Sequence, residues 1–132
     1  MSQENVELFF RGVDSWSRGD REAWVSEVPP EWEFHTSGLF PGLKPVYRGR
    51  SGAAELWEAM RGPWEDFEVS VERVEDLGER VLALVTFEVQ GRDGLKTSRQ
   101  WGYVATYRDG APIRTDNFDS WQGALEAAGI SE

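Results

Sequence analysis

The residue best suited to acid–base chemistry is His35, the single histidine of this 132-residue chain. An imidazole with its ordinary pKa of about 6.5 takes up or releases a proton around neutral pH. In the surrounding segment, Trp32, Phe34 and Thr36 alternate with Glu33 and His35, which is typical of a short strand with two different faces. The alternation places His35 opposite Trp32 and Phe34. His35 is therefore either a catalytic acid or base, or a hydrogen-bonded or exposed strand residue.

A second group of polar residues, Asp116, Asn117 and Asp119, lies near the end of the chain. If they belong to one strand, at least one side chain points to each face of it. A carboxylate between aromatic walls has a raised pKa because burial disfavours its charged form, and this suits a general acid or base. One of these residues, Asp116 among them, is therefore a candidate for proton transfer, and Asn117 is a candidate ligand contact. The alternative is that these residues serve turns or face solvent, with Asp119 at the start of the final helix.

Aromatic residues are the third candidate group, since the chain contains seven Trp, seven Phe and three Tyr. One interpretation is a pocket for a flat, apolar small molecule, lined by Trp16, Trp32, Trp57, Trp101 and Tyr107. Tyr103 is a candidate both for lining such a pocket and for catalysis. A buried phenol needs a hydrogen-bond partner, and it can polarise a carbonyl group. The other interpretation is that these rings simply fill the core.

The composition excludes several classes of site and partner. Lys and Arg number 14 against 24 Asp and Glu, a formal net charge of -10, which repels nucleic acids and anionic membranes. The absence of cysteine excludes disulfides and thiolate zinc sites, and a single histidine excludes multi-histidine metal cages. We expect no metal and no cofactor. The length suggests one domain over residues 1–132, and the lack of a signal or membrane-spanning pattern suggests a cytoplasmic protein.

Two helices are predicted to open the chain. Apolar residues recur at helical spacing from Val6 to Trp16, and Gly19 marks the end of that helix. Asp20 is placed to cap a shorter helix that stops at Pro29–Pro30. Two further helices are predicted, one capped by Ser51 and ended by Gly62–Pro63, and a final one capped by Ser120 and closed by Gly129.

A series of strands is predicted between the last two helices. Alternating or apolar runs cover residues 67–72, 81–89, 97–107 and 113–119, with turns at Gly78, Gly91–Gly94 and Arg108–Gly110. Trp101, Tyr103 and Tyr107 fall on one side of the third run. The segment 37–49 reads as an irregular loop that ends in a brief strand near Val46–Tyr47. The whole pattern predicts an α+β fold with helices packed on one face of a curved sheet.

Short motifs in this order resemble the SnoaL-like polyketide cyclase group of the nuclear transport factor 2-like superfamily. The motifs are Ser17-Arg18-Gly19-Asp20, Glu33-Phe34-His35, Val46-Tyr47-Arg48-Gly49-Arg50, Pro63-Trp64-Glu65-Asp66-Phe67, Arg108-Asp109-Gly110 and Ala124-Leu125-Glu126-Ala127-Ala128-Gly129. The resemblance covers essentially the whole chain. It implies a cone-shaped, cystatin-like fold in which a bent, mixed sheet wraps the N-terminal helices and leaves a pocket at one end. It also implies homodimers that pair through the outer face of the sheet.

The relatives include polyketide cyclases, ketosteroid isomerases, epoxide hydrolases, dehydratases and non-catalytic binding modules, so the fold alone does not define the function. By the likeness, His35 matches the position of the proton-moving carboxylate of the isomerases, and Asp116 that of a late-strand acid of the cyclases. The isomerases carry a tyrosine on the first helix where this chain has Gly12 or Val13. Two hypotheses remain. One is a pocket protein that binds a small hydrophobic or carbonyl-bearing molecule, with or without cofactor-independent acid–base catalysis of the isomerase, cyclase or dehydratase type. The other is a non-catalytic dimeric binding or accessory module with a filled pocket.

Overall fold

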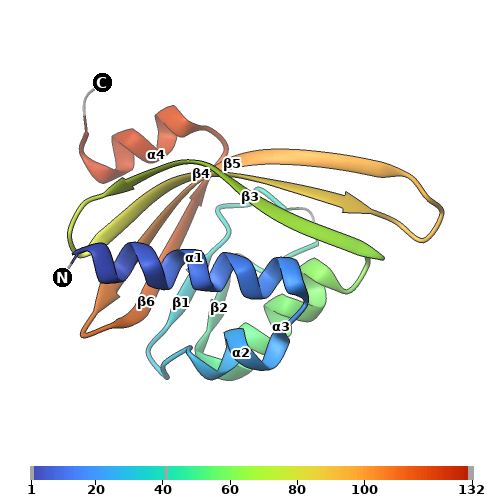
Figure 1. Ribbon diagram of the computed structural model, residues 1–132, viewed down its shortest axis with the longest axis horizontal. Helices are drawn as coiled ribbons and strands as arrows, with labels where there is room; N and C mark the ends of the chain where they lie inside the picture. Colours follow the sequence, from blue (N-terminus) through green and yellow to red (C-terminus); the bar gives the residue numbers. More distant parts are fainter. Residues whose placement is uncertain (1, 41, 131–132) are drawn as a thin grey trace.

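The computed structural model describes residues 2–40 and 42–130. Its helices are α1 (Ser2–Arg18), α2 (Arg21–Ser26), α3 (Gly49–Arg61) and α4 (Trp121–Ala128). Its strands are β1 (Glu33–His35), β2 (Val46–Arg48), β3 (Asp66–Asp76), β4 (Arg80–Gln90), β5 (Lys96–Arg108) and β6 (Ala111–Phe118) (Figure 1). The predicted α+β order is confirmed. Over the described ranges, we find no helix with the length and apolar character that crossing a bilayer requires.

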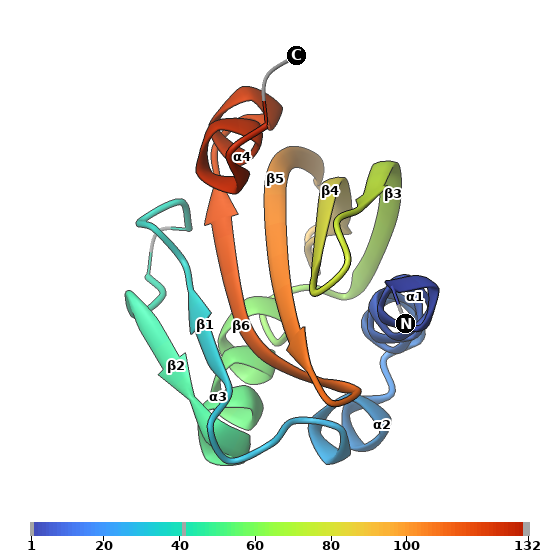
Figure 2. The same ribbon diagram turned by 90° about the vertical axis from the view of Figure 1, so that its left-hand side faces the viewer.

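The six strands form one curved sheet in the order β2-β1-β6-β5-β4-β3. Strands β3 to β6 pair antiparallel with their neighbours, whereas β1 pairs parallel with β6, so the sheet is mixed. The register shifts between Val71 and Arg73 in β3, and such irregularities increase bending and twist. Figure 2 shows the sheet as an arc, with α1, α2 and α3 on its inner side.

The main core lies between the concave face of the sheet and these three helices. Phe9 of α1 is 3% exposed, and Val13 and Trp16 pack against the same cluster at helical spacing. On α3, four residues at helical spacing, Ala53, Leu56, Trp57 and Met60, are all buried. In both helices, the apolar face that recurs at helical spacing packs into the core.

Three of the predicted helix ends are confirmed by their geometry. Asp20 accepts a hydrogen bond from the Ala23 amide at 3.1 Å, and Ser120 accepts one from the Gly123 amide at 3.0 Å. Gly129 closes α4 with a left-handed φ of 77°, which glycine adopts without strain. The predicted cap at Ser51 is wrong, because α3 begins at Gly49 and Ser51 lies within its first turn.

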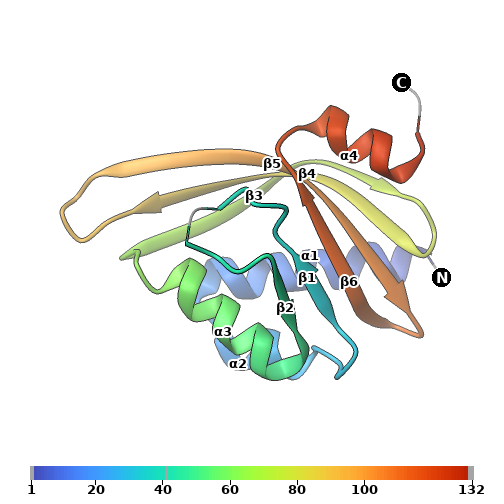
Figure 3. The ribbon, with the colours of Figure 1, turned by 180° about the vertical axis from the view of Figure 1, so that it is seen from behind.

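Helix α4 packs on the convex face of the sheet, so the prediction that all helices share one face is wrong for this element (Figure 3). Leu125 of α4 joins a separate apolar cluster with Leu82 and Val104, whose side chains point away from the main core. Gly102 permits this contact, since a Cβ atom there would lie 2.6 Å from the Ser120 carbonyl oxygen. A side chain at position 102 would therefore push α4 off the sheet.

Candidate functional site

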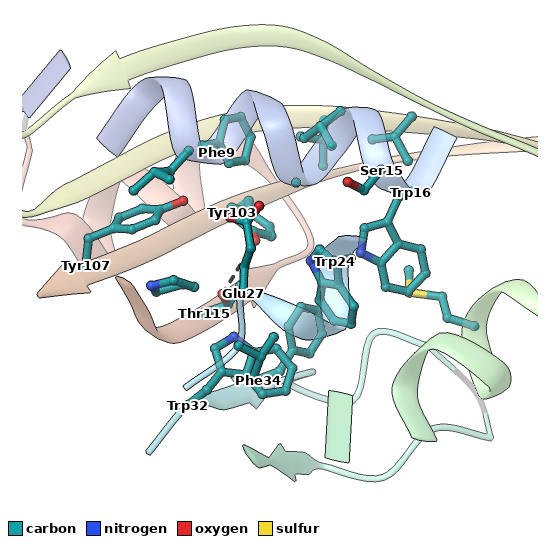
Figure 4. Close-up of a pocket in the computed structure, with 18 of the residues that line it drawn as sticks. Phe9, Ser15, Trp16, Trp24, Glu27, Trp32, Phe34, Tyr103, Tyr107 and Thr115 are labelled. Carbon is teal, nitrogen blue, oxygen red and sulfur yellow. Dashed lines mark hydrogen bonds between the residues drawn. The ribbon is translucent and has the colours of Figure 1, made fainter. Parts of the chain in front are cut away.

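A cavity of about 110 Å³ lies between the N-terminal helices and the concave face of the sheet (Figure 4). Nine of its twenty lining residues are aromatic, with rings contributed by α1, α2, β3, β5 and the segment around β1. Of the residues predicted to bind a ligand, four lie in this lining: Trp16, Trp32, Trp101 and Tyr107. Tyr103, predicted as a catalytic group, lies there too.

Strand β5 supplies the polar wall of the cavity. Trp101, Tyr103 and Tyr107 share the concave face of this strand, as the alternation predicted. The Tyr103 hydroxyl lies 3.4 Å from Thr115 Oγ1 on the neighbouring strand β6. Burial raises the pKa of Tyr103 and that of Tyr107, in the latter case with smaller contributions from the Tyr103 and Glu27 charges. Both phenols therefore keep their protons at neutral pH and can donate hydrogen bonds.

Three tryptophans form the helix-side wall. The Trp24 ring of α2 stands edge-on to Trp16 at 4.9 Å and to Trp32 at 5.6 Å between centroids. Trp57 of α3 packs behind this wall, 4.3 Å from Trp16 and 5.9 Å from Trp24. Trp57 does not reach the cavity, so its ring supports the wall and has no place in the lining.

A carboxylate lies where the cavity meets the surface. Glu27, which follows α2, lines the cavity and has a side chain that is 41% exposed. Arg11 of α1 engages both of its carboxylate oxygens, each at 3.1 Å, and so joins the two helices. Among the described lining residues, Glu27 alone carries a formal charge at neutral pH.

His35 and Asp116 do not lie in the cavity. Their neighbours Phe34 and Thr115 line the cavity. Because consecutive strand residues point to opposite faces, the His35 imidazole and the Asp116 carboxylate project from the convex face of the sheet. His35 Nε2 lies 2.8 Å from Glu33 Oε1, and this hydrogen bond lowers the pKa of Glu33. Asp116 accepts two hydrogen bonds from Arg114, at 2.9 and 3.0 Å. Of the three predicted catalytic residues, Tyr103 therefore lines the cavity, whereas His35 and Asp116 lie on the other face of the sheet.

Asn117 points to the concave side but is sealed beneath the cavity wall. It is 0% exposed, accepts a hydrogen bond from Trp101 Nε1 at 2.8 Å, and donates one to the His35 carbonyl oxygen at 2.8 Å. It therefore orients a ring of the lining and ties β6 to β1, and it has no surface in the cavity. Asp119, the third member of the predicted polar group, is exposed beyond the end of β6.

The model of the SnoaL-like domain matches residues 7–120, most of the chain. The chain belongs to the SnoaL-like domain family. This confirms the resemblance drawn from the short motifs. No curated protein matches the sequence significantly.

Solved structures that resemble this SnoaL-like domain show the same fold. TerC co-crystallised with polyporic acid is 21% identical over 93% of this chain and 96% of its own, with a TM-score of 0.76. An NTF2-like protein of unknown function from Burkholderia pseudomallei is 14% identical over 93% and 95%, with a TM-score of 0.77. A candidate polyketide cyclase from Xanthomonas campestris is 19% identical over 94% and 96%, with a TM-score of 0.71. At these identities the likeness establishes the nuclear transport factor 2-like fold alone.

Several lining residues of the domain were not predicted as site residues. Trp24, Glu27 and Thr115 face the cavity, and so do Phe9 and Phe34. For Thr115 a signal existed, because its side chain shares a face of β6 with Asn117, two residues away. For Glu27 there was none, since one glutamate at the end of a short helix resembles any solvated charge. In the described part of the chain, no three His, Cys, Asp or Glu side chains gather as a metal ion would require.

Proposed function

We propose that this SnoaL-like domain binds a small, largely apolar molecule about one ring in size, and holds an oxygen of that molecule on the hydroxyls of β5. The cavity of about 110 Å³ is somewhat smaller than a cavity of about 150 Å³ that is known to take up benzene. Aromatic walls favour a flat or cyclic apolar body. A few placed polar groups then fix its orientation.

The observation that carries this proposal is the Tyr107 hydroxyl. Tyr107 is 6% exposed and lines the cavity, and its hydroxyl forms no hydrogen bond with any other described residue. Because a buried polar group without a partner is costly, most such groups are satisfied in native proteins. Tyr103 presents a second hydroxyl from the same face of β5 to the same cavity. A carbonyl or ether oxygen that accepts from the Tyr107 hydroxyl would satisfy the free donor.

The proposal assigns a binding function and no reaction. The side chains of His35 and Asp116, the predicted acid–base pair, project from the convex face of the sheet, opposite to the cavity. Both tyrosines hold their protons too tightly to act as bases, because burial raises their pKa. Glu27 is the carboxylate that lines the cavity, and both of its oxygens are engaged by Arg11 in the contact that joins α1 and α2. Of the pocket hypothesis, we therefore propose the form without catalysis.

A titration with cyclohexanone tests the proposal, because this probe pairs one ring with one carbonyl oxygen. We expect binding to the wild-type protein and, in Tyr107→Phe, an affinity lower by about ten-fold. Tyr47→Phe is the matched control: its hydroxyl accepts a hydrogen bond from the Lys44 amide at 2.9 Å, and Tyr47 lies outside the cavity lining. Equal loss in both variants, or no binding of ring-sized probes to the wild type, would overturn the proposal.

Native mass spectrometry of the protein purified from its own host provides a second test. A co-purified molecule of about one ring, displaced by cyclohexanone, would support the cavity as its site. The predicted homodimer, paired through the convex face of the sheet, stays a prediction that the same spectrum tests. A monomer would remove the pairing without affecting the binding proposal.

A further inference from the structure

We infer that the cavity has a second hydrogen-bonding subsite, formed by the indole N–H groups of Trp24 and Trp32. The ligand is then a neutral molecule with two acceptor oxygens, one for the tyrosine hydroxyls of β5 and one for the indoles. This inference rests on the proposed function and adds the number and kind of polar groups on the ligand.

Trp32 provides the main evidence. It is 2% exposed and lines the cavity, and its Nε1 forms no hydrogen bond with the other described residues. In the described part of the chain, Arg21 Nε is the sole side-chain polar atom that is both fully sealed and without a hydrogen bond. The Trp32 nitrogen therefore keeps access to open space, and Figure 4 shows it on the edge of the ring that faces the cavity. An indole N–H donates and never accepts, so its missing partner is an acceptor.

Trp24 places a second indole N–H without a partner on the same side of the cavity. Its ring stands edge-on to Trp32, and its Nε1 also lacks a hydrogen bond within the described ranges. Gly12 of α1 leaves room at this nitrogen, because a Cβ atom there would lie 3.8 Å from Trp24 Nε1. Both tryptophans belong to the α2–β1 side of the cavity, whereas Tyr103 and Tyr107 belong to β5 (Figure 4).

Most polar side chains of the described lining already have a partner within the protein. Both oxygens of Glu27 accept from Arg11, and the Thr115 hydroxyl pairs with Tyr103. The Ser15 hydroxyl donates to the Arg11 carbonyl oxygen at 3.1 Å. The groups left without a partner are the indole N–H groups, which only donate, and the Tyr107 hydroxyl, which can donate. An ammonium group would leave the indoles unpaired, whereas a ligand with two carbonyl oxygens would satisfy both subsites.

The charge of the lining indicates a neutral ligand. No Lys, Arg or His side chain is among the described lining residues, so a carboxylate or phosphate would have no cation to balance it. Glu27, which carries the formal charge of the described lining, is already paired with Arg11, so it offers no unpaired anion to balance a cation. A cyclic dicarbonyl compound meets the requirements of size, charge and acceptor number.

Cyclohexane-1,4-dione and cyclohexanone form the decisive pair of probes, because they share the ring and differ in the second carbonyl. We expect the dione to bind about ten-fold more tightly, as one added hydrogen bond to a buried donor would provide. In ¹⁵N-labelled protein, the dione should shift the Nε1–H signals of Trp24 and Trp32. The Trp101 signal should stay in place, since that group already donates to Asn117 at 2.8 Å.

Variants then locate the subsite. Trp32→Phe should remove the preference for the dione, and Trp64→Phe, outside the cavity lining, should keep it. Equal affinities for the two probes in the wild type, with unmoved Trp24 and Trp32 signals, would overturn this inference and leave the proposed function standing. Failure of both probes to bind would overturn both. The wild-type comparison decides the question even if a tryptophan variant does not fold.

Discussion

His35 and Asp116 are direct neighbours across the parallel pairing of β1 and β6, and both side chains leave the sheet on its convex face. Each is already engaged along its own strand, His35 with Glu33 at 2.8 Å and Asp116 with Arg114 at 2.9 Å. The sheet thus carries two separate sets of side chains: a polar row outside, and a ring-lined cavity inside.

His35→Ala should leave binding in the cavity unchanged. The imidazole is on the far side of the sheet from the ligand space, so we expect the affinity for cyclohexanone to stay within about two-fold of wild type. Isothermal titration measures this directly, with Tyr107→Phe as the variant that should weaken binding. A ten-fold loss in His35→Ala, with an unchanged melting temperature, would show that the imidazole contributes to the site.

The Glu33 carboxyl should titrate below its ordinary value of 4.5. The hydrogen bond from His35 is the main reason for its lowered pKa, and the Arg48 charge at 3.5 Å adds to it. A lowered pKa in the folded state contributes stability above pH 4.5, and that contribution is lost as the pH falls through the folded value. In His35→Ala the Glu33 pKa should move back toward 4.5, measured by ¹³C NMR of the carboxyl.

The same titration in Arg48→Gln serves as the control. Since the Arg48 contribution is smaller, the Glu33 pKa should rise less than in His35→Ala. Identical Glu33 titration curves in wild type and His35→Ala would contradict the assignment.

Gly12→Ala should stabilise the fold and weaken binding together. Alanine is favoured over glycine in a helix interior by up to about 1 kcal/mol, and a Cβ atom at position 12 would lie at an ordinary 3.7 Å from Trp24 Cδ1. The methyl group would also occupy space beside the Trp24 indole. We expect a higher free energy of unfolding in urea and a several-fold weaker affinity for cyclohexane-1,4-dione.

Gly52→Ala provides the opposite case on α3. A Cβ atom there would lie 3.1 Å from the carbonyl carbon of Tyr47, which is backbone and cannot easily move. This variant should lower the free energy of unfolding. Stabilisation by both alanines would mean that helix propensity alone decides the outcome.

Asn117→Leu should destabilise the protein by roughly 2–4 kcal/mol, because it leaves the Trp101 indole N–H and the His35 carbonyl oxygen without their partner. Urea denaturation measures the change. Asn5→Leu is the matched control: its amide donates one hydrogen bond, to the Gly78 carbonyl oxygen at 2.9 Å, at a half-buried site. A loss for Asn117→Leu no larger than for Asn5→Leu would show that the buried network is dispensable.

The sequence predicted the elements well because their patterns are local. The near-continuous apolar run at 81–89 and the aromatic run at 97–107 located β4 and β5, and Asp20 and Ser120 marked two helix starts. The convex position of α4 could not be derived from its own apolar face, which fits either side of a sheet. Gly102, in the middle of an aromatic strand, was the available signal, since its missing side chain admits the helix.

The site was less predictable because it depends on which face of each strand turns inward. The alternation correctly placed His35 and Phe34 on opposite faces of their strand, yet it cannot indicate which of the two side chains faces the cavity. Nor could it separate Trp32, which lines the cavity, from Trp57, which packs behind it. Those distinctions arise from the curvature of the sheet and the seating of α2 and α3, which no short motif encodes.

Strand β1 is only three residues long, and its consecutive residues Phe34 and His35 belong to different surfaces. A shift of this strand by one position along β6 would turn the imidazole into the cavity and the phenylalanine ring out to water. The register of β1 on β6, more than residue identity, thus determines whether an ionisable group stands among the rings.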